Sequence, residues 1–276
     1  MIFIIGGRGR LGQAISSRHG ANNCVLLARS VYENWWQDSS QAEISRFFEP
    51  WEASNSSIIV AAGILDPKIS SDLHLNVNYL LPKSIIEGVA ELGLKVVTFG
   101  TVMEQLLNTQ NSYIQSKARL GTYIAGLSGD HQVAHFRLHT LYGGGWPSPF
   151  MFLGQILSCL RTATEFKMTL GRQLREYHHV EDDALAVQLF LDSGFTGATD
   201  LSHGEPVNLG ALATHIFRAF NAKKLLRIGA LTEPAEENYD RKFSRPTQLS
   251  GMDFRETLPA VAEYLKTCWR EMEDLA

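Results

Sequence analysis

The N-terminus of the chain joins a short apolar segment to a glycine-rich turn. Residues 2–5 read Ile-Phe-Ile-Ile, and three glycines follow at intervals of three residues. The first permits a tight turn, the second lets a pyrophosphate approach the backbone, and the third allows a helix to pack closely on the strand, with its N-terminus toward the phosphates. This pattern predicts a dinucleotide-binding site, with an ordinary strand–helix turn as the alternative. The residues expected to contact the dinucleotide are Gly6, Arg8, Gly9, Arg10, Leu11 and Gly12.

Apolar segments of strand length alternate with longer amphipathic segments in the first half of the chain. The apolar segments are rich in Val, Ile and Leu, as buried strands are, and the longer ones have helical spacing. Apolar strands that alternate with helices form a parallel, doubly wound sheet with helices on both faces. We therefore expect an α/β fold of Rossmann type, with strands at 2–5, 24–28, 58–62, 96–99 and 133–138 and helices near 11–18, 41–48, 75–92 and 113–127.

The pattern changes after Gly143. Residues 143–149 read Gly-Gly-Gly-Trp-Pro-Ser-Pro and must form a loop, and short strand-like segments mix with helices beyond it. The expected helices lie near 150–160, 182–191, 212–220 and 258–272, and the expected strands near 166–170, 176–180 and 206–209. We therefore expect a dinucleotide-binding domain in 1–142, joined by returning segments near 175–210, and a small mixed α/β substrate lobe in 143–276.

The composition is that of a soluble globular protein, with 276 residues of which 45% are apolar and 20% charged. The 25 Lys and Arg residues against 29 Asp and Glu give a net charge of −4, which excludes a basic surface for nucleic acid. No apolar run approaches the roughly 20 residues of a membrane span, and no signal peptide is recognisable. Three widely spaced cysteines, Cys24, Cys159 and Cys268, are expected to be reduced thiols. We therefore expect a cytoplasmic protein without membrane insertion.

The end of the second expected strand bears on the choice of cofactor. Enzymes that use NAD commonly have an acidic residue there, which binds the ribose 2′-hydroxyl. This chain has Ala28 followed by Arg29, and a guanidinium forms bidentate hydrogen bonds with a phosphate. Arg8 could add a second cation. The sequence therefore favours NADP(H) and leaves NAD(H) open, because Arg29 could also be a solvated loop charge.

Tyr113 and Lys117 lie four residues apart at the start of an expected helix, so their side chains share one face. A nearby ammonium lowers the pKa of a tyrosine toward the range in which it exchanges a proton with a carbonyl or alcohol. Lys117 can also bind the nicotinamide ribose, and Thr101, after the strand at 96–99, could hydrogen-bond the reacting oxygen. We expect these three residues to be catalytic; the chance alternative is a packed tyrosine beside a solvated lysine.

His131, His135 and His139 are spaced by four residues, which on a helix would form a metal-binding stripe. The apolar residues between them indicate a strand instead, and a strand with this spacing does not gather the three imidazoles as a helix would. We therefore expect no metal site in this chain.

These motifs together resemble the extended short-chain dehydrogenase/reductases of the NAD-dependent epimerase/dehydratase family, over nearly the whole chain. Beyond the glycine loop, Thr101, Tyr113 and Lys117, the resemblance rests on Ala-Ala-Gly at 61–63, Arg-Leu-His-Thr-Leu-Tyr-Gly at 137–143, Arg-Glu-Tyr-His-His-Val-Glu-Asp at 175–182 and Gly-Glu-Pro-Val-Asn-Leu-Gly at 204–210. The last three motifs are characteristic of the extended branch. The chain departs from the family at Gly100, where Ser is usual, and at Thr140, where many members have Asn.

Members of this family act on nucleotide sugars, so the resemblance implies a nucleotide-sugar substrate. The residues that it implies as lining the cofactor are Ala61, Ala62 and Gly63. Those that it implies as substrate contacts are Thr101, Thr140 and Arg175, with Arg175 at the nucleotide diphosphate and the loop at 143–149 nearby. Many relatives dimerise through helices that correspond to 75–92 and 113–127 here, which implies a homodimer, although the sequence leaves the oligomeric state open.

A narrower likeness concerns the short interval between Thr101 and Tyr113, the Gly-Thr pair at 100–101 and the Ala-Arg pair at 28–29. These features are similar to bacterial NDP-4-keto-6-deoxysugar reductases of the paratose/abequose synthase kind, which make dideoxy sugars for surface polysaccharide. The resemblance thus implies reduction of an NDP-4-keto-6-deoxyhexose by NADPH, with Tyr113 as proton donor. A nucleotide-sugar epimerase or dehydratase with the same residues is the alternative, and a non-catalytic NADP-binding module is a third reading.

Overall fold

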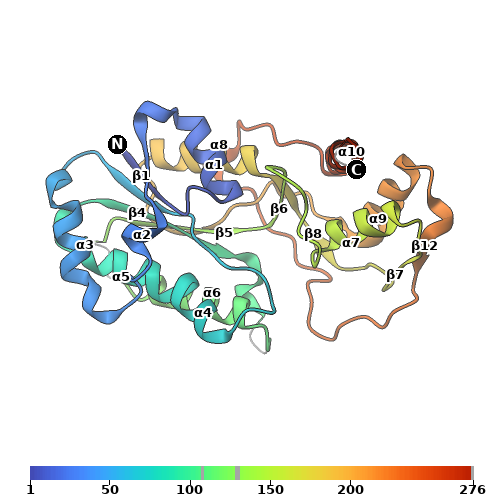
Figure 1. Cartoon of the computed structure of the whole chain (residues 1–276), viewed down its shortest axis with the longest axis horizontal. Helices are drawn as coiled ribbons and strands as arrows, with labels where there is room; N and C mark the ends of the chain where they lie inside the picture. The colour runs from blue at the N-terminus through green and yellow to red at the C-terminus, as the bar shows by residue number, and fades with distance from the viewer. Residues whose placement is uncertain (107–108, 128–130, 275–276) are drawn as a thin grey trace. The chain divides into compact units, whose positions relative to one another are not determined.

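The structure, a computed structural model, describes residues 1–106, 109–127 and 131–274 (Figure 1). The chain divides into two compact units. The first comprises Met1–Leu138 and Asp183–Leu201, and the second comprises His139–Asp182 and Ser202–Ala276. The chain therefore leaves the first unit after Leu138 and returns to it before it completes the second. The functional division expected from the sequence, cofactor in 1–142 and substrate in 143–276, stays a prediction.

A parallel sheet forms the centre of the first unit, and its order in the described residues is β2-β1-β3-β4-β5-β10. The chain runs from β1 to its neighbour β2 on one side and then crosses to β3 on the other side of β1. The direction of the strand order therefore reverses between β1 and β3, and the segments that follow these two strands leave toward opposite faces of the sheet. The crevice outside the carboxyl ends of such strands is where open α/β sheets bind ligands. The strands are β1 (Ile2–Ile5), β2 (Cys24–Leu26), β3 (Ser57–Val60), β4 (Lys95–Thr101), β5 (Val133–Leu138) and β10 (Gly197–Asp200).

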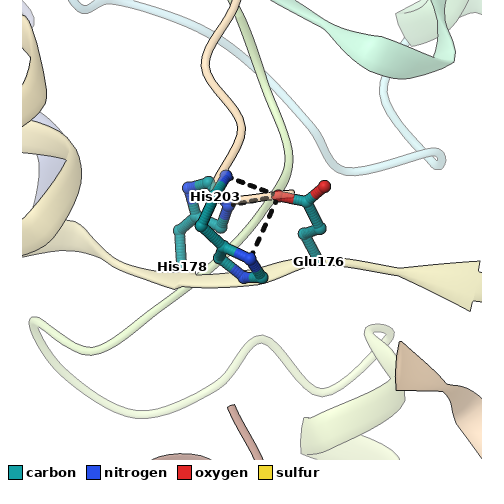
Figure 2. A group of neighbouring side chains, drawn as sticks. All are labelled: Glu176, His178 and His203. Carbon is teal, nitrogen blue, oxygen red and sulfur yellow. Dashed lines mark hydrogen bonds and ion pairs between the residues drawn. The ribbon is translucent and has the colours of Figure 1, made fainter. Parts of the chain in front are cut away.

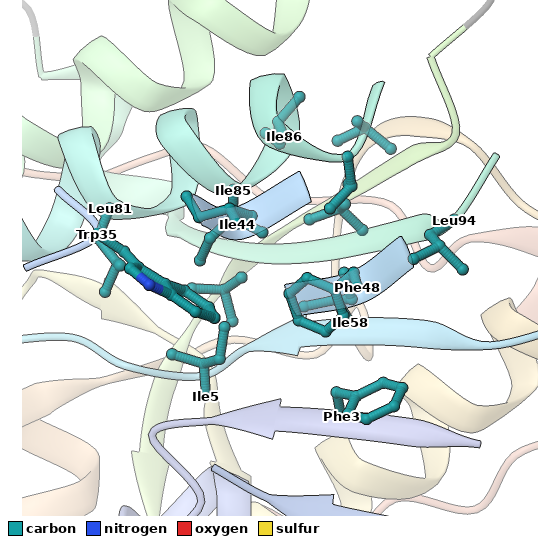
Figure 3. Packing of buried hydrophobic residues seen from close by; sticks show 14 of the residues in the cluster. Phe3, Ile5, Trp35, Ile44, Phe48, Ile58, Leu81, Ile85, Ile86 and Leu94 are labelled. Carbon is teal, nitrogen blue, oxygen red and sulfur yellow. The ribbon is translucent and has the colours of Figure 1, made fainter. Parts of the chain in front are cut away.

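The apolar side chains on both faces of this sheet are buried. Phe3 of β1 and Ile58 of β3 belong to one core cluster with Phe48, which lies on a covering helix (Figure 3). Ile4 and Ile59 alternate with them along the strands, so they point to the opposite face, and both are fully buried. Burial on both faces explains why these strands are continuous apolar runs in the sequence.

Helices cover both faces of the sheet (Figure 1). On one face lie α1 (Arg10–His19) and α8 (Val180–Asp192), which are joined by a 2.7 Å hydrogen bond from Arg18 Nε to Gln188 Oε1. On the other lie α3 (Gln41–Phe48), α5 (Leu81–Gly88) and α6 (Ser112–Ala125). The doubly wound α/β fold predicted from the sequence is confirmed.

The prediction of one long helix over 75–92 is wrong in its details. The segment comprises α4 (Ser71–Leu75), a π-helical turn (Asn76–Leu80), α5 and a 3-10 turn (Ala90–Leu92). Helix α4 begins before residue 75 because Ser70 caps it, with its hydroxyl accepting the Leu73 N–H at 3.3 Å. Pro82, in the first turn of α5, has no N–H to donate, so a regular α-helical ladder cannot continue through it.

Two other differences from the sequence-based prediction concern the strands β2 and β10. The strand expected at 24–28 ends at Leu26, and Arg29 already begins the short helix α2 (Arg29–Tyr32). Strand β10 was not expected because its sequence, Gly-Ala-Thr-Asp, is not an apolar run. Its place is defined instead by parallel pairing with β5, which pairs Asp200 with Arg137.

The second unit is a mixed α/β lobe, as predicted. Its described strands pair in twos: β6 (Thr140–Tyr142) with β9 (Tyr177–His179) and β7 (Phe166–Met168) with β12 (Leu226–Ile228) in parallel, and β8 (Leu174–Arg175) with β11 (Val207–Asn208) antiparallel. The helices are α7 (Phe152–Arg161), α9 (Leu209–Ala219) and α10 (Thr257–Glu273). They share a core in which Ile156, Ile216 and Leu265 are fully buried.

The structure also describes the three cysteines and the lengths of the helices. Cys24, Cys159 and Cys268 all lie in described residues, and none of them forms a disulfide. In the ranges that the structure describes, every helix is too short or too polar to cross a bilayer.

Candidate active site

The glycine loop connects β1 to α1 by a close approach of backbone to backbone. Gly6 has φ +82°, and a Cβ atom there would lie 2.3 Å from the Ala62 backbone nitrogen. In the first turn of α1, a Cβ on Gly12 would lie 2.6 Å from the Gly6 carbonyl oxygen. At Gly9 the tightest contact would be 3.3 Å, and this residue is exposed. Gly6 and Gly12 therefore serve packing, whereas the backbone at Gly9 is open to an approaching group.

Helix α1 begins at this open position. Its N-cap is Gly9, which has no side chain to accept a hydrogen bond from the first turn, so an anion could accept from those N–H groups instead. Leu11 is buried beneath the turn and Arg10 is partly buried. Arg8 is exposed, and Gln13 Nε2 donates to its carbonyl oxygen at 3.1 Å.

Residues 61–63 lie between the glycine loop and Lys117. The Ala61 N–H donates to the Ile5 carbonyl oxygen at 2.8 Å, which extends the pairing of β1 with β3. Gly63 is exposed, and a Cβ atom there would lie 3.8 Å from Lys117 Nζ. The predicted cofactor residues of both segments thus meet at the reversal between β1 and β3.

Arg29 is the first residue of α2 and follows Ala28 directly after β2. Its side chain is exposed, and within the described ranges neither Arg29 nor Arg8 forms an ion pair. Both guanidinium groups follow neighbouring strands at the carboxyl edge of the sheet, so both remain available to a phosphate near that edge.

The three predicted catalytic residues come together in the first unit. Thr101 ends β4, and its side chain lies near enough to that of Tyr113 to affect the pKa of the phenol. Tyr113 lies in the first turn of α6, where its N–H donates to Asn111 Oδ1 at 3.0 Å. One turn further on, Lys117 Nζ donates to the Phe99 carbonyl oxygen at 2.7 Å. The hydroxyls and the ammonium are therefore held beside the carboxyl end of β4.

The pKa values of Tyr113 and Lys117 differ from the sequence-based expectation. Burial raises the pKa of Tyr113 to about 12, the charge of Glu104 acts in the same direction, and the Thr101 side chain opposes them. Burial also lowers the pKa of Lys117 to about 8, against an upward effect of Glu104. The expectation that Lys117 lowers the pKa of Tyr113 is therefore not met, because loss of solvent around the phenol is the larger effect. At neutral pH the tyrosine is a neutral hydroxyl and the lysine is mostly an ammonium.

Asn78 supports this site and was missed in the sequence. It is fully buried on the π-helical turn, where its Oδ1 accepts the Ile64 N–H at 2.9 Å. Its Nδ2 donates to the Ile64 carbonyl oxygen at 3.0 Å and to Ser116 Oγ at 3.1 Å. Asn78 thereby ties the segment after Gly63 to the helix of Tyr113 and Lys117. The available signal was an amide in a segment otherwise expected to be a buried helix face.

The predicted substrate contacts Thr140 and Arg175 belong to the second unit. Thr140 begins β6, and its N–H donates to the Glu176 carbonyl oxygen at 3.1 Å. Arg175 forms an ion pair with Glu237, and its Nη1 donates to the Leu174 carbonyl oxygen at 2.8 Å. A diphosphate that binds Arg175 would therefore have to compete with the Glu237 carboxylate.

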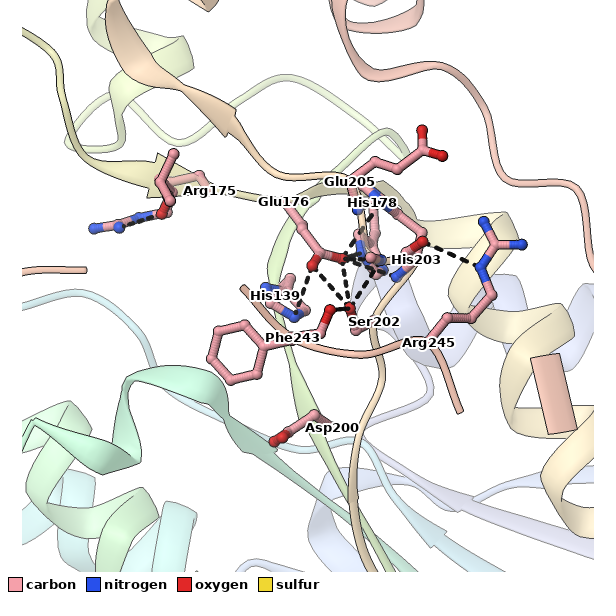
Figure 4. A network of polar contacts seen from close by, with 12 residues as sticks. His139, Arg175, Glu176, His178, Asp200, Ser202, His203, Glu205, Phe243 and Arg245 are labelled. Carbon is pink, nitrogen blue, oxygen red and sulfur yellow. Dashed lines mark hydrogen bonds and ion pairs between the residues drawn. The ribbon is translucent and has the colours of Figure 1, made fainter. Parts of the chain in front are cut away.

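Glu176, His178 and His203 form a buried polar cluster in the second unit (Figure 2). Each offers one ligand atom, and these atoms lie within 4.8 Å of one another, which is a spacing that could hold a metal ion. Glu176 Oε2 lies 3.1 Å from His178 Nε2 and accepts the His203 N–H at 2.8 Å. Figure 4 shows the surrounding network, in which Ser202 Oγ also donates to the carboxylate at 2.8 Å.

The hydrogen bonds of this cluster use the lone pairs that a metal would need. His203 Nδ1, the ring nitrogen nearer to Glu176, accepts the Glu205 N–H at 3.0 Å. The Glu176 carboxylate accepts from two side chains and the backbone, which nearly fills its capacity of about four bonds. The donor set therefore fits a satisfied buried carboxylate better than a metal site. The absence of a metal stays a prediction.

No protein-family model matches the chain, and no curated protein matches it. Solved structures do share its fold along almost the full length. A dTDP-4-dehydrorhamnose reductase from Clostridium acetobutylicum is 19% identical, covers 96% of this chain and 98% of its own, and has a TM-score of 0.74. A dTDP-4-dehydrorhamnose reductase from Bacillus anthracis, solved in complex with NADP, is 16% identical, covers 98% of each chain and has a TM-score of 0.71.

A third similar structure is the UDP-glucose 4-epimerase of Thermotoga maritima, solved with UDP-glucose. It is 14% identical, covers 98% of this chain and 99% of its own, and has a TM-score of 0.75. The chain therefore has a doubly wound α/β fold of the Rossmann type. More narrowly, it shares its fold with dTDP-4-dehydrorhamnose reductases and a UDP-glucose 4-epimerase, which confirms at the level of the fold the resemblance found in the sequence.

Proposed function

We propose that the protein is an NADPH-dependent reductase of an NDP-4-keto-6-deoxyhexose and belongs to the extended short-chain dehydrogenase/reductases. The observation that carries this proposal is that Thr101, Tyr113 and Lys117 come together at the carboxyl end of β4, with Lys117 one helical turn from Tyr113. The similar structures support it, because two are dTDP-4-dehydrorhamnose reductases and 4-dehydrorhamnose is itself a 4-keto-6-deoxyhexose.

The residues at the sheet edge fit NADP. The open backbone at Gly9 and the N-terminus of α1 suit a pyrophosphate, and exposed Gly63 leaves room beside Lys117 for the nicotinamide ribose. Arg29 and Arg8 supply two cations for the 2′-phosphate. Position 28, where an acidic side chain would repel that phosphate, is an alanine. When bound, the reduced nicotinamide supplies a hydride to the sugar carbon.

Tyr113 donates the proton that completes the reduction. As the carbonyl carbon accepts the hydride, its oxygen takes the Tyr113 proton and becomes a hydroxyl. A pKa of about 12 keeps that proton on Tyr113 at neutral pH, as a donor requires. The Thr101 hydroxyl orients the Tyr113 hydroxyl and can hydrogen-bond the reacting oxygen. The Lys117 ammonium stabilises the phenolate left after the transfer. Thr140 and Arg175 are the proposed substrate contacts of the second unit.

The absorbance of NADPH tests the proposal directly. Purified protein and NADPH are mixed with CDP-, dTDP-, GDP- and UDP-4-keto-6-deoxyhexoses, each generated in place, and the decrease of reduced nicotinamide is followed. Rapid oxidation with one of them is expected and would also identify the nucleotide. Binding of NADPH without oxidation by any of the four would exclude the reductase.

An epimerase is the second candidate, since the UDP-glucose 4-epimerase matches this chain with a TM-score of 0.75, as high as the reductases. An epimerase removes and returns one hydride on a retained cofactor. Tightly bound NAD in the purified protein would therefore favour epimerisation, whereas freely exchanging NADP would favour reduction.

A further inference from the structure

Glu104 is a nearly buried carboxylate beside the proposed catalytic residues, and the mechanism above gives it no role. We propose that Glu104 is a positioning residue of this site, which fixes Thr101 by a hydrogen bond and applies a negative charge to Tyr113 and Lys117. The inference rests on the proposed function, and it concerns the pH range in which Tyr113 can donate its proton.

The contact with Thr101 is local and well defined. Glu104 lies in the 3-10 turn Val102–Gln105 that follows β4, and its Oε1 accepts the Thr101 N–H at 2.8 Å. Thr101 Oγ1 in turn accepts the Met103 N–H at 3.3 Å, so the two side chains form a reciprocal capping box. This arrangement fixes the backbone and side chain of Thr101 at the point where its hydroxyl meets Tyr113.

The surrounding chain leaves space for this carboxylate. A Cβ atom on Gly100 would lie 1.9 Å from Glu104 Oε1, and one on Gly121 would lie 2.5 Å from Oε2. Gly100 is on β4, and Gly121 is on α6 one turn beyond Lys117. Two different elements therefore omit a side chain where the carboxylate lies. The side chain of Glu104 is only 7% exposed as a result.

The groups that face Glu104 come from the strands and helix packed around it. His135 Nε2 of β5 lies 3.7 Å from Oε1, and the other ring nitrogen of His135 is 2.8 Å from Thr98 Oγ1. Tyr113 and Lys117 belong to α6, the helix that packs against the Glu104 carboxylate at Gly121. The charge of Glu104 raises the pKa of both of these residues, in each case as the second contribution after burial. The carboxylate thereby favours the two protonated forms that the proposed reduction uses.

A titration of Lys117 tests this inference without any substrate. In Glu104→Gln, the amide oxygen can still accept the Thr101 N–H, but the charge is lost. The pKa of Lys117, followed by NMR of ¹³C-labelled lysine and assigned with Lys117→Met, is expected to fall by about one pH unit. The exposed Glu91 of the 3-10 turn Ala90–Leu92 gives a matched control, because Glu91→Gln removes the same charge at a distance.

The pH profile of NADPH oxidation is the second measurement. In Glu104→Gln the alkaline limb, at which Lys117 loses its proton well before Tyr113, is expected to move to lower pH by about one unit. Glu104→Leu also loses the bond to Thr101, so its kcat is expected to fall a further 10-fold or so.

A purely structural role would leave the titration and the profile of Glu104→Gln at their wild-type positions, and that result would overturn the inference. If wild-type protein oxidises no NADPH with any sugar, the proposed function fails, while the Lys117 titration still decides the role of the Glu104 charge. Failure of Glu104→Leu to fold would not affect either test, since both use Glu104→Gln.

Discussion

The protonation of Tyr113 follows from its neighbours. A partly buried phenol next to the Glu104 carboxylate keeps its proton up to high pH, which suits a donor to a carbonyl and not a base that removes a proton. The lysine one turn away has the opposite tendency, since burial lowers the pKa of Lys117 to about 8. At neutral pH the Tyr113 phenol and the Lys117 ammonium are therefore both protonated, as the proposed reduction requires.

Replacement of Tyr113 by Phe removes the proposed donor and little else. Turnover in Tyr113→Phe is expected to fall by roughly 10²- to 10⁴-fold, the range of a general acid, while the Kd for NADPH changes little. Steady-state kinetics and fluorescence titration with NADPH measure the two quantities. Tyr123→Phe, on the same helix and with its hydroxyl 3.3 Å from Glu87 Oε1, is the matched control. Near wild-type turnover in Tyr113→Phe would rule out the assignment.

Arg29 is expected to determine the preference for NADPH. Loss of one charge-assisted contact to the 2′-phosphate weakens binding by about 10- to 100-fold, so Arg29→Ala is expected to raise the KM for NADPH by that factor and leave that for NADH unchanged. Arg46→Ala, which removes an exposed guanidinium from α3, serves as the control. An equal loss with both cofactors would show that Arg29 does not contact the 2′-phosphate.

Among the elements, the glycine loop is the one whose geometry was most predictable. The order strand, glycines, helix demands a close approach, and the 2.3 Å distance from a Cβ on Gly6 to Ala62 shows where it occurs. The long helix at 75–92 was less predictable, because neither Ser70 as a cap nor Pro82 as a break was weighed against its apolar spacing. The spacing of apolar residues indicates which face of a helix is buried. It does not indicate whether the α-helical hydrogen bonds continue without a break.

The close approach at Gly6 can be separated from the effect of its backbone angle. Gly6 and Gly20 both have φ +82°, but a Cβ atom on Gly20 would meet nothing within 4 Å. Gly20→Ala is therefore expected to lower the free energy of unfolding by about 1–3 kcal/mol, the strain of its backbone conformation (φ 82°, ψ 145°) without any contact. Gly6→Ala is expected to cost at least about 2 kcal/mol more, because backbone atoms must also move. Urea unfolding followed by circular dichroism compares them, and equal losses would contradict a tight contact at Gly6.

Most of the candidate site was visible in the sequence because motif spacing encodes it. Thr101, Tyr113 and Lys117 were recognisable from their positions after a strand and on one helix face. Asn78 and Glu104 were not. Asn78 bonds Ser116 on an element distant in sequence, and Glu104, although it bonds the nearby Thr101, also packs against β5 and α6, which only the fold brings close to it. The raised pKa of Tyr113 was also unpredictable, because it depends on burial and on a carboxylate that only the fold brings close.

For the molecule as a whole, we expect Glu176 and the buried histidines beside it in the second unit to make the stability fall in acid. Burial lowers the pKa of His139 to about 3 and that of His203 to about 4. Burial alone would raise the pKa of Glu176, but the bond with His178 and the other histidines lower it to about 2. All three groups bind fewer protons when folded than when unfolded, so each favours the folded state at neutral pH and does so less as the pH falls.

The contribution of His139 to the pH dependence of stability can be measured. Its unfolded pKa is near 6.5 and its folded pKa about 3, so its contribution is present above pH 6.5 and is lost as the pH falls toward 3. Between pH 7 and pH 5, the loss is about 2 kcal/mol of unfolding free energy. Urea unfolding of wild type and His139→Asn at both values is expected to show a smaller loss in the variant. Equal differences in the two proteins would refute the assignment.

The sixth strand of the first sheet has a consequence for how the protein is made and how it can be divided. Strand β10 and most of α8 come from residues 183–201, after a long excursion of the chain. A ribosome must therefore release about two hundred residues before the parallel sheet of the first unit can be completed. Until then Phe136 of β5 lacks Phe190 and Phe195, whose rings later lie 5.0 and 6.0 Å from it. A truncation at residue 138 would leave that aromatic surface and the open edge of β5 in water, where nascent chains aggregate.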